Sequence, residues 1–433
     1  MPAEKRKIAF HTLGCKLNFA ESSYIASLLP SGRYEKVSPD RKADIYVINT
    51  CTVTAEADKK CRQAIRKFIN LSPGAIIAVI GCYSQLRASE IASIPGVDIV
   101  LGSGDKYDLP LYLENIPHKK KSGIITGTFV GNEIFIPSWS AGDRTRTFVK
   151  IQDGCDYGCS YCTIPMARGR SRSADIKTII EELKRISEKR IPEVVLTGVN
   201  IGDFGRSAGE SFAGLLREAE KIDGIGRIRL SSVEPNLLSN EIIEMVSLSK
   251  KIMPHFHIPL QSGSNRILGL MRRRYRREVF AWRVEKIKSL MPLAGIGADV
   301  ITGFPGESES DFEETFSFLE SLPVTYLHVF PYSERPGTPA ASLPGKVPAE
   351  VRNARRKKLT ALSGKKNLGF KQQNINSNCE VLFESSVRNR IITGFTGNYL
   401  KAEHPYETGL KGKIIKVKIN GIAPSGNLSV TFI

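Results

Sequence analysis

The stretch Asp153-Gly-Cys-Asp-Tyr-Gly-Cys-Ser-Tyr-Cys-Thr-Ile-Pro165 holds three cysteines, Cys155, Cys159 and Cys162, with the spacing C-x3-C-x2-C. Three thiolates in one short loop can bind three irons of a 4Fe-4S cube, because cysteine thiolate is the usual ligand of such clusters. The fourth iron would then have no protein ligand and could chelate a small molecule that carries an amine and a carboxylate. The loop therefore predicts an iron–sulfur cluster with one open iron.

A structural zinc site is the alternative interpretation of three close cysteines. Zinc sites usually close around four ligands, often arranged as two separated pairs, and no fourth Cys or His stands within about ten residues of the loop. A disulfide is disfavoured because nothing in the chain indicates export. The spacing favours the cluster over both alternatives.

The segment from about 145 to 345 alternates short apolar runs with amphipathic stretches, which is typical of βα units. Strands are expected at 147–151, 193–198, 227–232, 255–260, 296–303 and 326–332, with helices between them, for example at 175–189 and 308–322. Six such units make a partial (β/α)6 barrel. Because the cysteine loop follows the first strand, it should lie at the carboxyl-end face, where barrel enzymes place their chemistry.

The N-terminal segment repeats the βα alternation, so a parallel sheet is expected there too. Its buried strands are predicted at 8–13, 45–50 and 76–80, and Cys15, Cys51 and Cys82 each stand just past one of them. Ligands bind at the carboxyl ends of strands in open α/β sheets, so these cysteines can converge into a second three-cysteine cluster site. The alternative is three small cysteines buried separately in an apolar sheet.

The C-terminal segment begins with a basic helix at 348–371 and a short polar linker at 374–378. Five short strands follow, at 379–384, 390–394, 398–403, 413–419 and 427–433. This pattern predicts a small OB-like barrel, a fold often used to hold nucleic acid. The predicted fold class is α/β throughout, with domains at 1–140, 141–372 and 373–433.

The charge balance favours a polyanionic partner. The 433-residue chain has a formal charge of +18, and its excess gathers in two runs, Arg272–Arg277 and Arg352–Lys358. Nucleic acid is the first candidate, although solvated helix faces also look like this. The N-terminus does not resemble a signal peptide, and no apolar run approaches the roughly 20 residues of a membrane span. With eight cysteines and no sign of export, a cytoplasmic protein without membrane contact is expected.

Several phrases resemble the methylthiotransferase family of radical S-adenosylmethionine (SAM) enzymes: Gly14-Cys-Lys-Leu-Asn18, Asn49-Thr-Cys-Thr-Val-Thr54, Gly81-Cys-Tyr-Ser-Gln85 and the loop itself. Further phrases, at 164–172, 196–202, 230–235, 257–263 and 330–338, resemble its branch acting on threonylcarbamoyladenosine in tRNA. The resemblance implies an N-terminal methylthiotransferase domain with an auxiliary cluster, a radical SAM core and a C-terminal TRAM domain that binds RNA.

The resemblance also implies two 4Fe-4S clusters with separate tasks. The cluster on Cys155, Cys159 and Cys162 would cleave SAM to a 5′-deoxyadenosyl radical, which takes hydrogen from C2 of the modified adenine at position 37. The auxiliary cluster on the other three cysteines would deliver a methylated sulfur, with a second SAM as methyl donor. The candidate SAM contacts are Tyr161, Thr197, Gly198, Val199, Ser232, Glu234, Gln261 and Gly263.

Other residues have open roles at this stage. The turn 303–307 resembles a phrase lining the family's SAM pocket, and Arg168, Arg170 and Arg172 could hold SAM carboxylate or tRNA phosphate, or form a solvated loop. Arg273 and Arg274 are expected to contact tRNA. Cys61 and Cys379 match no cluster motif and are expected to be structural.

The expected partners are the anticodon loop of tRNA and an electron donor such as flavodoxin or ferredoxin. Two other acceptors stay open for the same chemistry, namely isopentenyladenosine in tRNA and an aspartate side chain of a ribosomal protein. A hypothesis of another class is a non-catalytic iron–sulfur protein that binds RNA and senses redox state. That protein would need neither the strand-end SAM motifs nor two open cluster sites.

Overall fold

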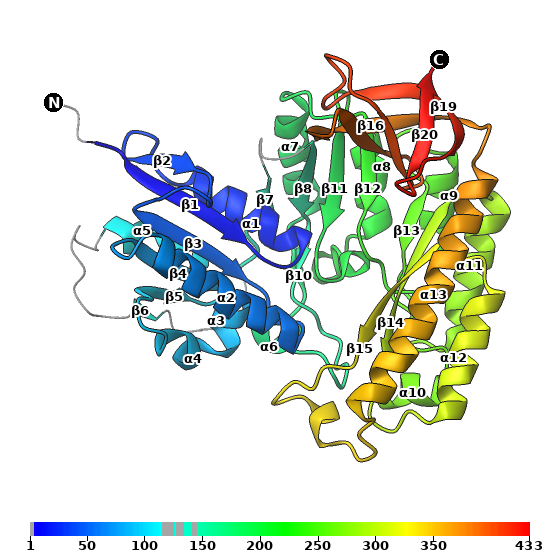
Figure 1. Cartoon of the computed structure of the whole chain (residues 1–433), viewed down its shortest axis with the longest axis horizontal. Coiled ribbons are helices and arrows are strands. Elements are labelled where there is room, and N and C mark those ends of the chain that lie inside the picture. Colours follow the sequence, from blue (N-terminus) through cyan, green and yellow to red (C-terminus); the bar gives the residue numbers. More distant parts are fainter. Residues whose placement is uncertain (1–3, 115–124, 127–133, 141–144) are drawn as a thin grey trace. The chain divides into compact units, whose positions relative to one another are not determined.

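The computed structural model describes residues 4–114, 125–126, 134–140 and 145–433, which fold into two compact units (Figure 1). The first unit comprises residues 1–141, 148–174 and 333–338, and the second comprises 142–147, 175–332 and 339–433. The first unit therefore contains both sets of three cysteines. Among the described residues, no helix is long and apolar enough to cross a membrane.

The first unit is built on a parallel six-stranded sheet in the order β2-β1-β3-β4-β5-β6. Three of its strands were predicted, namely β1 (Arg6–Thr12), β3 (Ile45–Thr50) and β4 (Ile76–Gly81). The others are short and escaped prediction: β2 (Tyr34–Val37), β5 (Ile99–Leu101) and β6 (Ile125–Thr126). In register, Ile45 pairs with Ile8 on one side and with Ile76 on the other.

Helices cover both faces of this sheet, as the burial of its strands on both sides requires. Tyr46 and Ile48 pack with α2 (Ala55–Leu71) in one core, and Ile45 and Val47 pack with residues of α1 (Lys16–Ser27) in the other. The Thr54 side chain caps the first turn of α2. The remaining helices of the sheet are α3 (Cys82–Leu86), α4 (Ala88–Ala92), η1 (Asp105–Asp108) and α5 (Leu109–Glu114).

The cysteine loop also belongs to the first unit. Strand β8 (Arg146–Lys150) begins in the second unit and leads into the first, where β9 (Gln152–Asp153) and β10 (Arg172–Ser173) pair as an antiparallel hairpin. The hairpin encloses the loop and the short helix α6 (Ile164–Arg168). The short strand β7 (Ser138–Trp139) pairs with the end of β8.

The second unit confirms the predicted βα alternation. Five parallel strands follow one another: β11 (Glu193–Thr197), β12 (Arg227–Leu230), β13 (His255–His257), β14 (Gly295–Thr302) and β15 (Tyr326–Pro331). With β8, they give the six strands expected for the partial barrel. The intervening helices are α7 (Ile176–Ser187), η2 (Ile201–Asp203), η3 (Arg206–Ala208), α8 (Phe212–Glu220), α9 (Asn240–Leu248), α10 (Asn265–Leu270), α11 (Arg277–Leu290) and α12 (Glu309–Ser321).

The C-terminal part forms the predicted small barrel. The long helix α13 (Ala349–Gln373), preceded by η4 (Pro339–Ser342), leads into a closed barrel in the order β16-β17-β18-β20-β19. Its strands are β16 (Asn378–Arg388), β17 (Ile391–Thr396), β18 (Lys401–Pro405), β19 (Ile414–Ile422) and β20 (Leu428–Phe432).

A turn of this small barrel docks against the larger barrel. The Arg229 guanidinium donates to the carbonyl of Gly397 at 2.9 Å and to that of Thr396 at 3.2 Å, while its Nε lies 3.0 Å from the Glu193 carboxylate. The turn lies within the segment 394–399. In the structure, its contacts with Arg229 serve to join two parts of one unit.

Candidate active site

Three cysteines stand at neighbouring strand ends of the first unit's sheet. Cys15 precedes α1, Cys51 follows β3, and Cys82 opens α3 directly after β4. Since β1, β3 and β4 are adjacent and parallel, their carboxyl ends meet at one edge. Gly14 allows the close approach: a Cβ there would lie 2.6 Å from the Cβ of Cys51, and its φ of +99° suits glycine.

The Cys51 thiol of this set lies in an environment that disfavours its ionisation without a cation. Cys51 and Cys82 are buried, while Cys15 is exposed. Burial raises the pKa of the Cys51 thiol to about 12, and the neighbouring Cys15 and Cys82 add to the effect. Three thiolates close together repel one another, so this set needs bound cations to be stable in the ionised form.

The cysteine loop is shaped by local backbone hydrogen bonds. The amide of Cys155 donates to the carbonyl of Gly169 at 3.1 Å. Two amides point at sulfur: that of Tyr157 donates to Sγ of Cys155, and that of Ile164 to Sγ of Cys162, each at 3.4 Å. Such N–H donors stabilise sulfur that carries negative charge. The loop therefore presents its sulfurs in a form that suits metal ligands.

The two sets of cysteines are neighbours within the first unit. The hydroxyl of Thr163, next to Cys162, donates to the carbonyl of Thr52, next to Cys51, at 3.5 Å. A second link runs through Asn18, whose Oδ1 accepts from Arg168 at 2.7 Å and from the Cys15 thiol at 3.7 Å. The structure thus brings together two cysteine sets whose members lie far apart in the sequence.

Arg168 is part of a buried ion network. The sequence had suggested that it holds SAM carboxylate or tRNA phosphate, or lies in a solvated loop, and none of these roles includes such a network. Its Nη1 lies 3.0 Å from Glu21 Oε1 and 2.9 Å from Asp153 Oδ1, and its side chain is only 1% exposed. Arg172 pairs with Asp153 at 3.1 Å. Of these three arginines, only Arg170 lies in solvent, with 92% of its side chain exposed, as the solvated-loop alternative predicted.

The network holds its carboxylates firmly in the ionised form. Burial alone would raise the pKa of Glu21, but Arg168, Lys106 and Lys150 outweigh it and hold that pKa well below its usual range. The pKa of Asp153 is likewise lowered against burial, by Lys150, Arg168 and Arg172. Both carboxylates therefore stay charged at neutral pH, although their side chains are almost wholly buried.

The network carries more positive than negative charge. Four basic side chains, those of Lys106, Lys150, Arg168 and Arg172, form ion pairs with two carboxylates, those of Glu21 and Asp153. Burial lowers the pKa of Lys106, and the other three basic groups still outnumber the two carboxylates. Uncompensated buried charge is costly, so an anionic group nearby would be stabilising. Thiolates that ligate iron supply negative charge, and Cys82 acts electrostatically on Arg168. The donor set and the surrounding charge both fit cysteine-bound iron–sulfur clusters.

Zinc fits this arrangement less well. Ligands of one tetrahedral zinc ion at about 2.3 Å lie about 3.8 Å apart. In the part of the chain that the structure describes, neither cysteine set forms a group of three ligand atoms that all lie within 4.8 Å of one another. A multi-iron cube accepts ligands that lie further apart, because each cysteine binds a different iron.

The other predicted site residues lie in the second unit, except Tyr161 in the loop. Thr197 ends β11 and is buried, and Gly198 and Val199 follow it. Ser232 follows β12 and forms a bridge with His257. Gln261 follows β13 and adopts a left-handed φ of +69°. These residues thus share the carboxyl-end edge of the parallel strands, as their positions in the sequence predicted.

Two of the predicted SAM contacts at this strand-end edge, Glu234 and Gly263, contact other parts of the protein. Glu234 forms an ion pair with Arg273, whose side chain is 4% exposed. Burial raises the pKa of Glu234 against the effect of Arg273. Gly263 packs on α12, where a Cβ would lie 2.7 Å from Cα of Thr315. The prediction that Arg273 contacts tRNA is therefore wrong, because its side chain is buried and its guanidinium is held by Glu234.

Some of the expected basic surface is also buried. Arg355 pairs with Glu307 at 2.6 Å and with Glu309 at 2.8 Å, and its side chain is 6% exposed. Gly303 and Glu307 are thereby fixed to α13, since the Gly303 amide donates to Glu307 Oε2. Arg272, Arg274, Lys357 and Lys358 remain exposed.

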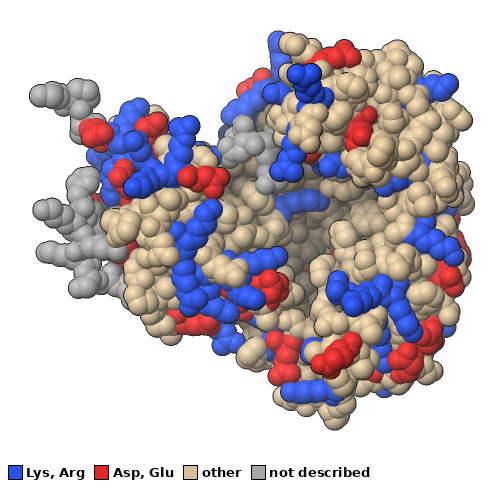
Figure 2. All heavy atoms as spheres, in the orientation of Figure 1, with Lys and Arg blue, Asp and Glu red and all other residues tan. Residues whose placement is uncertain are grey.

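A different basic surface was missed by the sequence interpretation. The helix α2, which begins shortly after Cys51, exposes Lys59, Lys60, Arg66 and Lys67. Figure 2 shows Lys and Arg gathered over the region of the first unit where Figure 1 places α2. The helical spacing of these residues was the available signal. We define Lys59, Lys60, Arg66 and Lys67 as the α2 basic face.

Arg335 is a further residue that the sequence interpretation did not single out. Its guanidinium donates to the hydroxyl of Thr52 at 2.7 Å and pairs with Asp58 at 2.8 Å. It lies in the phrase 330–338 and is buried beside the residue that follows Cys51. A buried arginine at this point ties the end of the phrase to the strand-end cysteine site.

A partial βα barrel with a three-cysteine loop and a strand-end cysteine set defines the class of radical SAM enzymes with a second cysteine site. The model of the Radical SAM superfamily matches residues 149–319, and that of the uncharacterized protein family UPF0004 matches residues 7–102. A solved structure of the radical SAM methyltransferase TsrM from Kitasatospora setae shares the fold, with a TM-score of 0.54 at 13% identity, over 78% of this chain and 75% of that one.

Two curated relatives match over nearly their whole length. Threonylcarbamoyladenosine tRNA methylthiotransferase MtaB of Bacillus subtilis (strain 168) is 41% identical over 95% of this chain and 93% of its own. tRNA-2-methylthio-N(6)-dimethylallyladenosine synthase of Moorella thermoacetica is 33% identical over 94% of each chain. The chain belongs to the radical SAM methylthiotransferase family and is an enzyme of that class. Membership implies a 4Fe-4S cluster and SAM.

Proposed function

We propose that this enzyme converts N6-threonylcarbamoyladenosine at position 37 of tRNA to its 2-methylthio derivative. The observation that carries the proposal is the adjacency of two three-cysteine sites within one compact unit, linked through Thr52 and Thr163. Sulfur insertion needs one centre that generates a radical and another that supplies sulfur. A non-catalytic sensor would need only one cluster.

We assign Cys155, Cys159 and Cys162 to the cluster that binds SAM, and Cys15, Cys51 and Cys82 to an auxiliary 4Fe-4S cluster. When bound, the two clusters and SAM together supply the reducing electron, the 5′-deoxyadenosyl radical, the sulfur and the methyl group. A ring C–H is too weakly acidic for side-chain bases at neutral pH, which is why the protein needs this chemistry.

The protein's own residues stabilise the sulfurs of the loop and orient the two cysteine sets. The amides of Tyr157 and Ile164 donate to the loop sulfurs and stabilise their negative charge. Arg168 fixes α6 to Asn18 and Glu21 of α1, so the backbones that carry both cysteine sets keep one relative position. Catalysis here depends on geometry, because small displacements of reacting groups cost orders of magnitude in rate.

The candidate SAM contacts remain those of the strand ends. Thr197, Gly198 and Val199 would approach the amino group of SAM through the backbone, and Tyr161 would lie beside its adenine. Ser232 and Gln261 are further polar candidates. For Glu234 the ion pair with Arg273 supports a positioning role, in which Arg273 holds the carboxylate and opposes the rise of its pKa on burial.

The tRNA would be held through its phosphates and its unpaired anticodon loop. The α2 basic face and the C-terminal barrel support this role. The proposal includes the three domains 1–140, 141–372 and 373–433, a cytoplasmic location, and an electron donor such as flavodoxin or ferredoxin. The boundary at 140/141 borders residues outside those described.

The acceptor is assigned by similarity. A relative whose name specifies threonylcarbamoyladenosine is 41% identical, and one whose name specifies dimethylallyladenosine is 33% identical. The difference favours the threonylcarbamoyl acceptor, and isopentenyladenosine in tRNA or a ribosomal protein aspartate is the alternative.

Nucleoside mass spectrometry tests the proposal. Threonylcarbamoyladenosine-containing tRNA is incubated anaerobically with reconstituted protein, SAM and reductant, next to a tRNA carrying isopentenyladenosine. A product heavier by one methylthio group on the first tRNA alone supports the proposal. Formation of 5′-deoxyadenosine without this product would overturn the acceptor, and absence of SAM cleavage would overturn the enzyme assignment.

A further inference from the structure

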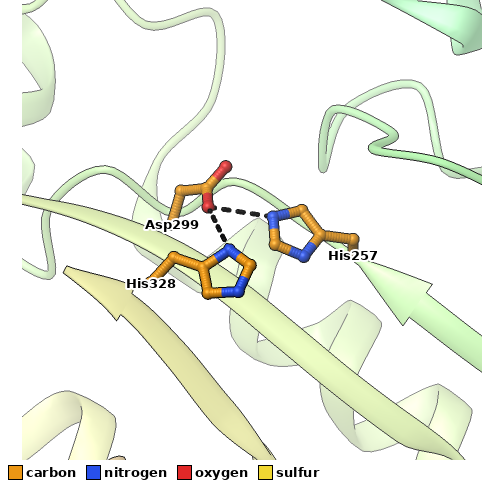
Figure 3. Close-up of side chains that lie close together, drawn as sticks. All are labelled: His257, Asp299 and His328. Carbon is orange, nitrogen blue, oxygen red and sulfur yellow. Dashed lines mark ion pairs between the residues drawn. The ribbon is translucent and has the colours of Figure 1, made fainter. Parts of the chain in front are cut away.

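Two histidines and an aspartate on three adjacent parallel strands of the second unit lie close together. His257 ends β13, Asp299 lies in β14 and His328 in β15, and all three side chains point toward one another (Figure 3). The Nε2 of His257 lies 2.9 Å, and the Nδ1 of His328 lies 3.4 Å, from the same Oδ1 of Asp299. We propose that these side chains bind one divalent transition-metal ion, such as Zn²⁺ or Fe²⁺.

The spacing of the three ligand atoms fits a single ion. Nitrogen and oxygen ligands at about 2.1 Å from a metal lie about 3.0 Å apart in octahedral cis positions and about 3.4 Å apart in a tetrahedron. The two separations from Asp299 match these values, and all three ligand atoms lie within 4.8 Å of one another. Among the described residues, no other three His, Cys, Asp or Glu meet this criterion.

The charge of the group selects a cation. An imidazole ligates a metal in its neutral form and an aspartate as a carboxylate, so the three ligands together would bring one negative charge to a bound ion. An anionic ligand would be repelled by Asp299, whereas a divalent ion would be attracted. Two imidazoles and one carboxylate are a common set for first-row divalent metals, and oxygen-only ions such as Mg²⁺ would be less suited.

The strands hold the three residues in place. Asp299 and His328 are direct partners in the parallel pairing of β14 and β15, and His257 pairs with Gly297 two residues before Asp299. The side chains therefore project to the same face of the sheet. A site on three adjacent strands is more rigid than one on loops, which favours metal binding without backbone movement.

A tyrosine orients one of the imidazoles. The hydroxyl of Tyr326 lies 3.4 Å from the Nδ1 of His257 and 2.9 Å from the Nε2 of His255. Metal-binding histidines usually have their second nitrogen hydrogen-bonded, which fixes the tautomer and the ring. If Nδ1 of His257 is held by Tyr326, its Nε2 is directed to the shared site beside Asp299.

The site is reachable from solvent. The side chains of His257, Asp299 and His328 are 14%, 25% and 54% exposed. Three protein ligands leave one to three positions of the ion open for water or for an oxygen atom of another molecule. The competing interpretation is a metal-free triad in which both imidazoles donate to Asp299, at the same distances.

Zinc binding separates the two interpretations. Full-length protein with reconstituted clusters, its iron and sulfide content measured, is titrated with Zn²⁺ by calorimetry, and bound zinc is quantified after gel filtration. His328→Ala and Asp299→Asn are compared with the wild type. His404→Ala is the matched control, because it removes a histidine of the C-terminal barrel whose Nδ1 faces the carbonyl of Pro405.

We expect about one additional Zn²⁺ in the wild type and in the control, and affinity weaker by about tenfold or more in both site variants. Equal iron and sulfide in all four proteins shows that folding and clusters are unchanged. Should one site variant lose its clusters, the other decides. No additional zinc in the wild type, or equal zinc binding in the site variants, would overturn the proposal. The readout is independent of methylthiolation and of the acceptor.

Discussion

The two three-cysteine sites of the first unit are assembled in opposite ways. Cys155, Cys159 and Cys162 share one loop, closed by the β9–β10 hairpin and its own amides. Cys15, Cys51 and Cys82 come from three strand ends and meet only when the sheet has formed. The comparison teaches that the loop site depends on local backbone structure, whereas the strand-end site depends on the whole sheet.

The largest expected effect comes from removing one cysteine of each set. Cys155→Ala should reduce 5′-deoxyadenosine formation to background, because the loop loses a ligand of the cluster that binds SAM. Cys82→Ala should leave that reaction within about threefold of the wild type and abolish methylthiolation. Each variant should lose about four irons. Iron analysis and product chromatography measure both effects.

Cys61→Ala is the control for this comparison, since its thiol is buried and donates to the carbonyl of Cys51 without matching a cluster motif. It should keep both clusters. If Cys82→Ala stopped SAM cleavage as completely as Cys155→Ala, the separation of tasks between the two sites would be wrong.

The second prediction concerns the link between the sites. Arg168→Leu should lower the free energy of unfolding by about 3–5 kcal/mol, because Glu21 and Asp153 each lose a buried partner. Arg170→Leu, at a position 92% exposed, should change it by less than about 0.5 kcal/mol. Urea unfolding of anaerobically prepared protein measures the difference.

The iron content of Arg168→Leu sharpens the comparison further. Arg168 contacts residues of α1 as well as Asp153 beside the loop, so both sites should load poorly. Loss of only one cluster would show that Arg168 supports a single site and does not couple the two.

The sheet and the strand-end cysteines could be predicted because they leave local patterns. Buried runs such as 45–50 and 76–80 read as strands, and parallel strands align their carboxyl ends whatever lies between them. The loop site could be predicted from still less of the sequence, since the spacing of its three cysteines alone brings the sulfurs together. What the sequence could not provide was the partner of each charge.

Arg168 shows why those partners escaped prediction. Its carboxylate partner Glu21 lies 147 residues away on a helix where a glutamate is normally exposed. Arg273 looked like part of a basic run, yet Glu234 holds it from a distance of 39 residues. The triad of His257, Asp299 and His328 is likewise spread over three strands. Such pairs depend on the register of the whole fold, which no local pattern records.

The third prediction tests the dependence of the strand-end site on close backbone packing. Gly14→Ala places a Cβ 2.6 Å from that of Cys51 at a φ of +99°, and should cost about 2–3 kcal/mol. About half the iron should be lost, while SAM cleavage persists. Gly364→Ala is the control: it lies in α13 with open space around the new Cβ, and should stabilise the protein slightly.

Iron content distinguishes a local effect from a general one here. Loss of both clusters in Gly14→Ala at full secondary structure would mean that the loop site also depends on the sheet. That result would remove the contrast between the two sites, because local amides would then be insufficient to form the loop.

The smallest expected effect concerns the charges beside each site. After the loop, Arg168 is buried, Arg172 is half-buried and Arg170 is exposed, whereas after Cys51 all four cations of the α2 basic face are exposed. The strand-end site therefore offers more cations to tRNA phosphates. Lys59→Ala combined with Lys60→Ala should weaken tRNA binding severalfold at low salt. The slope of log affinity against log salt should become shallower by about 0.7–0.9 for each phosphate that the variant no longer neutralises.

Lys177→Ala combined with Lys184→Ala is the matched control, because both residues are exposed on α7 and the net charge changes equally. Its salt slope should stay at the wild-type value. If both double variants changed the slope alike, tRNA would respond to the overall charge of +18 and not to the α2 basic face. A specific change would mean that the site assembled from distant strand ends also positions the acceptor, since α2 starts a few residues after Cys51 and moves with it.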